Sequence, residues 1–172
     1  MKKGIDYISK KHLFIVGGTA MERKEYITEI IENANYETFR FPSGMKTLYD
    51  YLDLVRKKDL YTPWYEKKGK HGTNQVLEFH RDWLRDNKSL VVLEEIQEME
   101  QDWKVELIRY YIDAVAIRKK GDTNIHLIIS QEEERDLLEK LSHKISFPEN
   151  YNRTRSQIVE SAIKVIDIST RN

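Results

Sequence analysis

The chain has 172 residues, of which 34% are charged and 40% hydrophobic, and its formal net charge is +0. This composition predicts a soluble globular domain with a real core, and it argues against a generic nucleic-acid coat. The absence of cysteine excludes disulfides, thiol nucleophiles and cysteine metal sites. No apolar run approaches the roughly 18 residues that span a membrane, and residues 1–12 lack the apolar segment of a signal peptide. We therefore expect a cytoplasmic protein without a membrane partner.

Short apolar runs and helical stripes alternate along the chain. An apolar run bounded by turn residues predicts a strand, and apolar residues spaced i, i+3, i+4 and i+7 predict a helix. The predicted strands are residues 12–16, 36–41, 90–93, 125–129 and 144–147. The first predicted helix begins near Glu22, and the later ones cover residues 48–55, 75–85, 103–117, 132–141 and 156–166.

Strands that alternate with crossover helices form a parallel sheet with helices on both faces. The sequence therefore predicts a single α/β domain over residues 1–172. Its architecture is a three-layer α/β/α sandwich with a five-stranded, mainly parallel sheet.

Two carboxylates, Glu94 and Glu95, directly follow the apolar run at residues 90–93. Acidic residues at the carboxyl end of a parallel strand lie where open α/β sheets bind their ligands. Glu94 in that position is suited to hold Mg²⁺, and Glu95 is suited to polarise an attacking water as a catalytic residue. The alternative is a buried strand followed by solvated acidic side chains.

Four segments, in this order, resemble the core of P-loop NTPases and in particular the AAA+ family. Residues 15–31 (IVGGTAMERKEYITEII) resemble its first strand, Gly-rich loop and helix, and residues 91–99 (VVLEEIQEM) resemble its Walker B strand. Residues 125–134 (IHLIISQEEE) resemble the strand that ends in sensor one, at Ser130. Residues 141–150 (LSHKISFPEN) resemble the arginine-finger segment. The resemblance covers residues 12–168 and implies ATP and Mg²⁺ as cofactors if nucleotide binding is retained.

The phosphate-binding loop departs from the family pattern. A Walker A loop reads GxxxxGK[ST], and its glycines let backbone N–H groups wrap the phosphates. When the loop starts at Gly17, Glu22 takes the third-glycine position, Arg23 the lysine position and Lys24 the Ser/Thr position. Starting at Gly18 instead places Lys24 in the lysine position and Arg23 in the glycine position. The residues that remain candidates for nucleotide binding are Gly17, Gly18, Thr19, Arg23, Lys24 and Ser130.

Two further features depart from the family. The arginine-finger position falls on His143 or Lys144, and the small helical lid domain is absent from the predicted elements. The alternative for the glycine loop is a strand-to-helix turn without a ligand. These departures imply a chain that works with a protein partner or within an AAA+-like oligomer.

Residues 59–74 predict a long exposed loop that is both basic and aromatic. Such a loop is able to stack on single-stranded nucleic acid or to dock a protein partner, and the remaining alternative is an ordinary solvated loop. The side chains that would make these contacts are Trp64, Tyr65, Lys67, Lys68, Lys70 and His71.

Three functional hypotheses follow. The first is a degenerate, non-hydrolysing AAA+-like protein that acts as a binding or assembly module in DNA-related machinery. The second is an atypical Mg-dependent ATPase that uses Arg23 or Lys24 together with Glu94 and Glu95. The third is a nucleic-acid-binding module that works through the loop at residues 64–71.

Overall fold

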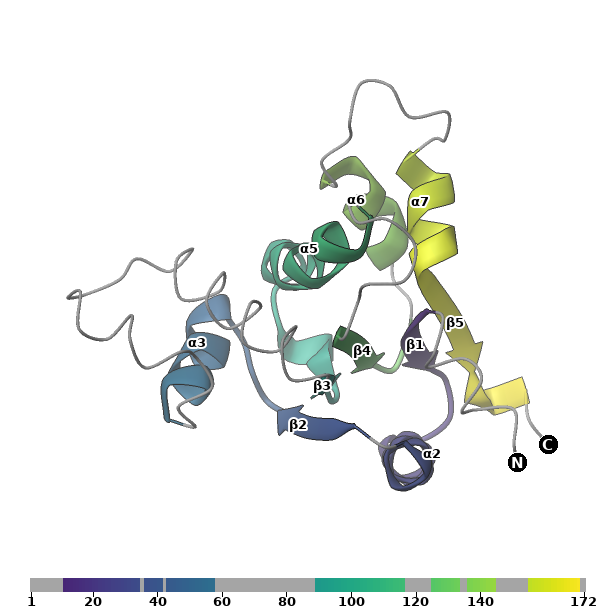
Figure 1. Cartoon of the computed structure of the whole chain (residues 1–172). Coiled ribbons are helices and arrows are strands. Elements are labelled where there is room, and N and C mark those ends of the chain that lie inside the picture. The colour runs from purple at the N-terminus through teal and green to yellow at the C-terminus, as the bar shows by residue number, and fades with distance from the viewer. Residues whose placement is uncertain are drawn as a thin grey trace.

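Five parallel strands form one sheet in a computed structural model of the chain (Figure 1). The structure describes residues 11–34, 36–41, 43–57, 89–116, 125–133, 136–144 and 155–170. The strands are β1 (His12–Val16), β2 (Glu37–Phe41), β3 (Ser89–Leu93), β4 (Ile125–Ser130) and β5 (Ile163–Asp167), and their order in the sheet is β2-β3-β4-β1-β5. The helices are α2 (Ala20–Asn33), α3 (Leu48–Lys57), α5 (Gln101–Ala116), α6 (Leu137–Lys144) and α7 (Arg155–Ala162), with short 3-10 helices η2 (Ile96–Glu98) and η3 (Ile168–Thr170).

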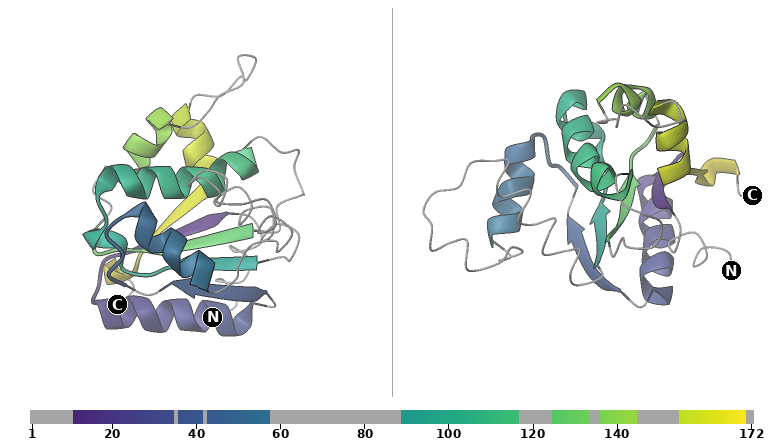
Figure 2. Two further views of the ribbon diagram at one scale, coloured as in Figure 1. Left: turned by 90° about the vertical axis from the view of Figure 1, so that its left-hand side faces the viewer. Right: turned by 45° about the horizontal axis from the view of Figure 1, so that its top comes forward.

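Helices cover both faces of the sheet, which explains why its inner strands are continuously apolar. Leu13 and Ile15 of β1 point to the face covered by α2, where they pack with Ile27. Phe14 and Val16 point to the opposite face, toward a larger core that includes residues of α3, α5, α6 and α7. Figure 2 shows α2 on one side of the sheet and α5, α6 and α7 on the other. The predicted three-layer α/β/α sandwich is confirmed.

The fifth strand is a correction to the sequence analysis. Lys144, predicted to begin that strand, ends α6, and residues 145–147 lie outside the described residues. The strand is Ile163–Asp167, and its first four residues fall within the helix predicted over residues 156–166. It pairs in parallel with β1 from His12↔Ile163 onward. The helical stripe was misleading because the β-branched residues that complete it also favour a strand once an open sheet edge supplies hydrogen-bond partners.

One further helix boundary differs from the prediction. The helix predicted over residues 132–141 begins at Leu137, and Asp136 immediately before it has a positive φ of 55°. The loop predicted at residues 59–74 and the helix predicted at residues 75–85 lie outside the described residues. None of the helices in the described segments is long and apolar enough to cross a membrane.

Candidate functional site

The carboxyl ends of three neighbouring strands place the predicted site residues close together. Gly17 and Gly18 follow β1, Glu94 and Glu95 follow β3, and Ser130 ends β4, which lies between those two strands. The register Ile15↔Ser130 and Leu93↔Ile129 aligns these ends at one edge of the sheet. This is the edge at which open α/β sheets bind ligands.

The side chain of Arg23 fills the inside of the glycine turn. It is only 3% exposed, and its Nη1 donates to the carbonyl oxygens of Gly17 at 2.7 Å and Gly18 at 2.8 Å. Its Nε and Nη2 donate to the two carboxylate oxygens of Glu95, each at 2.7 Å. The turn therefore directs carbonyl oxygens at a guanidinium, whereas a phosphate-binding loop directs N–H groups at an anion. We call these three acceptors, Gly17, Gly18 and Glu95, the guanidinium cradle.

Glu95, which supplies the carboxylate of the guanidinium cradle, has an uncommon backbone conformation. Its φ of 51° and ψ of 56° place it in the left-handed region, which non-glycine residues rarely adopt. Its carboxylate also accepts hydrogen bonds from Ser130 Oγ at 3.1 Å and Gln97 Nε2 at 3.0 Å, and its N–H donates to Ser130 Oγ at 3.0 Å. Backbone conformations of this kind persist when surrounding contacts hold them, and here the contacts to Arg23 and Ser130 do so.

The electrostatics of this pair favour the charged forms. Burial raises the pKa of the Glu95 carboxyl, but hydrogen bonds from Arg23, Gln97 and Ser130, with the charge of Arg23, outweigh burial and hold that pKa below its usual value. The hydrogen bonds to Glu95 raise the pKa of Arg23 in turn, against the opposing effect of burial. A glutamate held ionised by a two-point guanidinium contact is a poor general base, because its lone pairs are already engaged.

The amino-terminal end of α2 is closed by the chain's own carboxylate. Glu22 accepts hydrogen bonds from the Thr19 N–H at 2.7 Å and the Thr19 hydroxyl at 2.9 Å, and its own N–H donates to Thr19 Oγ1 at 3.2 Å. This capping box satisfies donors that a helix start would otherwise offer to an anion. The backbone hydrogen bond from Thr19 also lowers the pKa of Glu22. The Glu22 carboxylate therefore occupies the start of α2, which is the position where a helix would otherwise bind a phosphate.

Glu94 is paired in the same manner by a second arginine. Arg40 of β2 donates through Nε to Glu94 Oε2 at 2.7 Å and through Nη2 to Glu94 Oε1 at 2.5 Å. Its Nη1 lies 3.3 Å from Thr28 Oγ1 on α2. The Arg40 side chain is 32% exposed and that of Glu94 is 14% exposed, so this pair lies nearer the surface than Arg23 and Glu95. Each carboxylate predicted to handle a metal or water is thus neutralised by its own guanidinium.

The glycine turn is also tightly packed. Gly17 has φ of 75°, and a Cβ at that position would lie 2.1 Å from Oδ1 of Asp167, at the end of β5. Its N–H donates to the carbonyl oxygen of Glu132 at 3.1 Å. Asp167 is held in turn by the hydroxyl and N–H of Ser169. Close packing against β5 is therefore a sufficient reason for glycine here, without a ligand.

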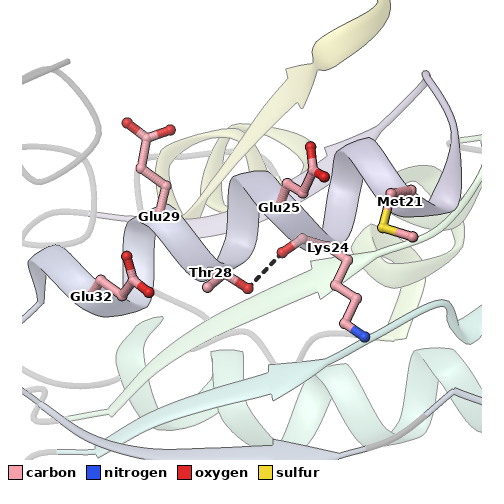
Figure 3. A pocket seen from close by; sticks show the side chains of 6 residues that line it. All are labelled: Met21, Lys24, Glu25, Thr28, Glu29 and Glu32. Carbon is pink, nitrogen blue, oxygen red and sulfur yellow. Dashed lines mark hydrogen bonds between the residues drawn. The ribbon is translucent and has the colours of Figure 1, made fainter.

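The structure separates the two basic residues of the loop. Arg23 points into the cradle, whereas Lys24 lies on the outer face of α2. There it lines a shallow hollow of about 290 Å³ (Figure 3). The other residues that line it are Met21, Glu25, Thr28, Glu29 and Glu32. Lys24 therefore lies away from the cradle, on a helix face that is mainly acidic.

The remaining predicted residues fall elsewhere. His143 and Lys144 are exposed at the end of α6, and the residues of the basic-aromatic loop lie outside the described residues. Among the residues that the structure does describe, no three His, Asp or Glu side chains are grouped so as to hold a metal ion.

Sequence reasoning missed the role of the two arginines. Arg23 lies four residues before Ile27 and seven before Ile30, so it belongs to the buried stripe of α2, and that spacing was the available signal. Arg40 lies in β2, and its partner strand β3 ends at Leu93, directly before Glu94. The register Phe41↔Leu93 brings the two strand ends together. For Arg40 the available signal was a charged residue near the end of a strand that is rich in aromatic residues.

Comparisons with known proteins agree with this architecture. No protein-family model and no curated protein sequence matches the chain. Cdc6p from Pyrobaculum aerophilum has a similar structure, with a TM-score of 0.55 and 10% identity over 93% of this chain and 41% of that chain. A Signal Transduction ATPase with Numerous Domains protein with a tetratricopeptide repeat sensor, from Pyrococcus horikoshii, has a TM-score of 0.55 and 11% identity, over 98% of this chain and 22% of that chain.

Likeness at such low identity concerns the fold alone. The chain has an α/β fold with a five-stranded parallel sheet like that of P-loop NTPases, and it spans less than half the length of each of these two structures. The activities of those proteins are not transferred to it by this likeness.

Proposed function

We propose that this chain is a degenerate AAA+-like domain that does not hydrolyse ATP and serves as a binding or assembly module. One observation carries the proposal, namely the buried side chain of Arg23 between the glycine carbonyls and Glu95. A phosphate could enter only after the guanidinium had left and the Gly17 and Gly18 peptides had turned their N–H groups inward. The first change breaks the buried ion pair between Arg23 and Glu95, which costs several kcal/mol. The second breaks the hydrogen bonds from Arg23 to the two glycine carbonyl oxygens.

The charges around the cradle support the same conclusion. Glu22 at the start of α2 would face an incoming phosphate with a like charge, and Glu95 would lose its counter-charge when Arg23 moved. Glu94 is already bound at both oxygens by Arg40, so Mg²⁺ would have to compete with a guanidinium for it. Each component of a nucleotide site is thus engaged by another side chain of the same protein.

A second candidate function is an atypical ATPase. Ser130 Oγ contacts the carboxylate of Glu95, which is the contact expected if a sensor residue and a catalytic glutamate were both retained. In that case Arg23 would swing from the cradle to the phosphates and free Glu95. A setting in DNA-related machinery rests on analogy of fold, and the nucleic-acid hypothesis for residues 64–71 stays a prediction.

Thermal unfolding with and without millimolar Mg-ATP tests the proposal. A ligand at about 100 times its dissociation constant stabilises a protein by about 2.7 kcal/mol, which shifts the melting temperature of a domain this size by several degrees. We expect no shift beyond that caused by Mg²⁺ alone. A dose-dependent shift that Arg23→Ala or Lys24→Ala removes, together with phosphate release that Glu95→Gln abolishes, would establish the ATPase alternative.

A further inference from the structure

Two large hydrophobic side chains are mostly exposed in the described part of the chain, Met21 at 64% and Tyr49 at 57%. Tyr49 lies in the first turn of α3, and its ring meets that of Trp103 in the first turn of α5, with centroids 5.7 Å apart and planes at 64°. Trp103 is partly buried against the main core. The two rings form an edge-to-face pair in which Trp103 packs against the core. We call this pair of side chains the aromatic ledge.

The core of the domain does not account for the position of Tyr49. Helix α3 buries Tyr51, which is 0% exposed and packs against Phe41 with ring centroids 4.8 Å apart. Tyr49 precedes Tyr51 by two residues, which on a helix turns its side chain toward the other side. A large aromatic side chain held in place while mostly exposed is typical of residues that anchor a protein interface.

Several exposed acidic residues lie close to Tyr49 and Trp103 along the chain. Asp53 follows Tyr49 by one helical turn, Asp102 immediately precedes Trp103, and Glu100 lies three residues before Trp103. The N–H of Glu100 donates to the carbonyl oxygen of Lys46 at 3.1 Å, which ties the start of α5 to the segment that leads into α3. Within residues 43–54 and 96–106, the exposed charged side chains are five carboxylates and one lysine: Asp50, Asp53, Glu98, Glu100, Asp102 and Lys46. Asp50 caps the start of α3, where its Oδ2 accepts hydrogen bonds from the N–H groups of Lys46 and Thr47, each at 2.8 Å. We therefore call the other four carboxylates the acidic rim.

We propose that the aromatic ledge and the acidic rim bind an arginine-rich peptide segment of a partner protein. A guanidinium is planar, so it can lie over the face of Trp103 or Tyr49 while its N–H groups pair with rim carboxylates. A lysine ammonium would gain the charge attraction but not the planar stacking. Phosphates of a nucleic acid would meet repulsion on this surface. The inference rests on the proposed function as a binding module and assigns the class of its partner.

Fluorescence anisotropy of the full chain with labelled octa-arginine and octa-lysine peptides tests this inference, at about 0.15 M salt where long-range attraction is screened. The test variant is Tyr49→Ala/Asp53→Asn/Asp102→Asn. The matched control is Met21→Ala/Glu25→Gln/Glu29→Gln, which removes the other exposed hydrophobic side chain and two exposed carboxylates from α2. Both variants change exposed side chains, both shift the net charge equally, and their melting temperatures verify the fold.

The wild type should prefer octa-arginine to octa-lysine. The test variant should bind octa-arginine roughly tenfold more weakly and lose that preference, because about 1.4 kcal/mol of stacking and charge pairing is removed. The control variant should change by less than twofold, and Tyr49→Phe should retain the arginine preference.

Four results would overturn the inference. Equal losses of octa-arginine affinity in the test and control variants would mean that the peptide responds only to total charge. Equal affinity of the wild type for octa-arginine and octa-lysine would mean the same. Dimers of the wild type that dissociate in the test variant would make the ledge an interface between copies of this chain. Single-stranded DNA that binds the wild type and not the test variant would replace the peptide by nucleic acid. None of these results depends on Mg-ATP, so the inference and the proposed function can fail separately.

Discussion

Two groups of carboxylates lie within one short stretch of sequence, yet the fold treats them differently. Glu94 and Glu95 are each held at both oxygens by an arginine, whereas Glu100 and Asp102 are exposed beside Trp103. The arginines come from α2 and β2, far away in sequence, and reach the carboxyl end of β3 only because the sheet forms. The site at the sheet edge is thus closed by the protein's own side chains, whereas the carboxylates beside Trp103 are exposed, as the proposed binding of an arginine-rich partner requires.

Arg23→Ala should produce the largest change, because it leaves Glu95 without its counter-charge inside the cradle. Removing one partner of a buried ion pair costs about 3–5 kcal/mol of unfolding free energy. Urea denaturation measures this loss. The Arg23→Ala/Glu95→Ala double variant should be less destabilised than the sum of the two single changes. Strict additivity would show that the two side chains do not interact.

Gly17→Ala should be the next largest change. Alanine at φ of 75° costs about 1–2 kcal/mol, and the Cβ would also collide with Asp167 Oδ1 at 2.1 Å. Gly44→Ala is the matched control, because Gly44 has φ of 92° and open space around it. We expect the first to cost about 1–3 kcal/mol more than the second, and Asp167→Ala to recover part of the difference. Equal melting temperatures for the two alanine variants would contradict the close packing of the turn.

The pH dependence of stability should report on Glu95. Because its pKa is lowered in the folded protein below the ordinary value of 4.5, its contribution is present above that pH. The contribution is lost as the pH falls below 4.5 through the folded pKa. Between pH 5 and pH 3 the unfolding free energy of the wild type should therefore fall more steeply than that of Glu95→Gln. Parallel curves for the two proteins would mean that the carboxylate is not held ionised by Arg23.

Arg40→Ala should have the smallest effect, because its ion pair with Glu94 lies nearer the surface. Partly exposed pairs of this kind contribute about 0.2–1 kcal/mol. The loss should shrink further in 1 M salt, while the loss in Arg23→Ala should change little. A salt-insensitive loss in Arg40→Ala as large as that in Arg23→Ala would remove the distinction between the two pairs.

Much of the fold could be predicted from the sequence, because strands buried on both faces are unbroken apolar runs. The predicted first strand coincides with β1, and residues 90–93 lie within β3. The last strand was missed because α7 passes directly into β5 without glycine or proline, and Val159 and Ile163 lie on one helical stripe. Only pairing with β1 makes residues 163–167 a strand and not a continuation of the helix, and the local sequence does not reveal such pairing.

The candidate site could be located but its contacts could not be predicted. The glycine turn, Glu94, Glu95 and Ser130 meet at one sheet edge, as the order of strands and helices implied. The pairing of Arg23 with Glu95 depends on side chains 72 residues apart in sequence. The capping box of Thr19 and Glu22 is local, and the spacing Thr19-x-x-Glu22 is a signal that the sequence analysis did not use.

The side-chain Nε–H resonance of Arg23 tests the central claim most directly. In ¹⁵N-labelled protein, with Arg23→Lys to assign the signal, this N–H should be protected from exchange by its hydrogen bond to Glu95. We predict that its shift and protection remain unchanged when Mg-ATP is added to several millimolar. A resonance that moves or loses its protection with increasing Mg-ATP would mean that the guanidinium leaves the cradle for a nucleotide, and it would contradict the account.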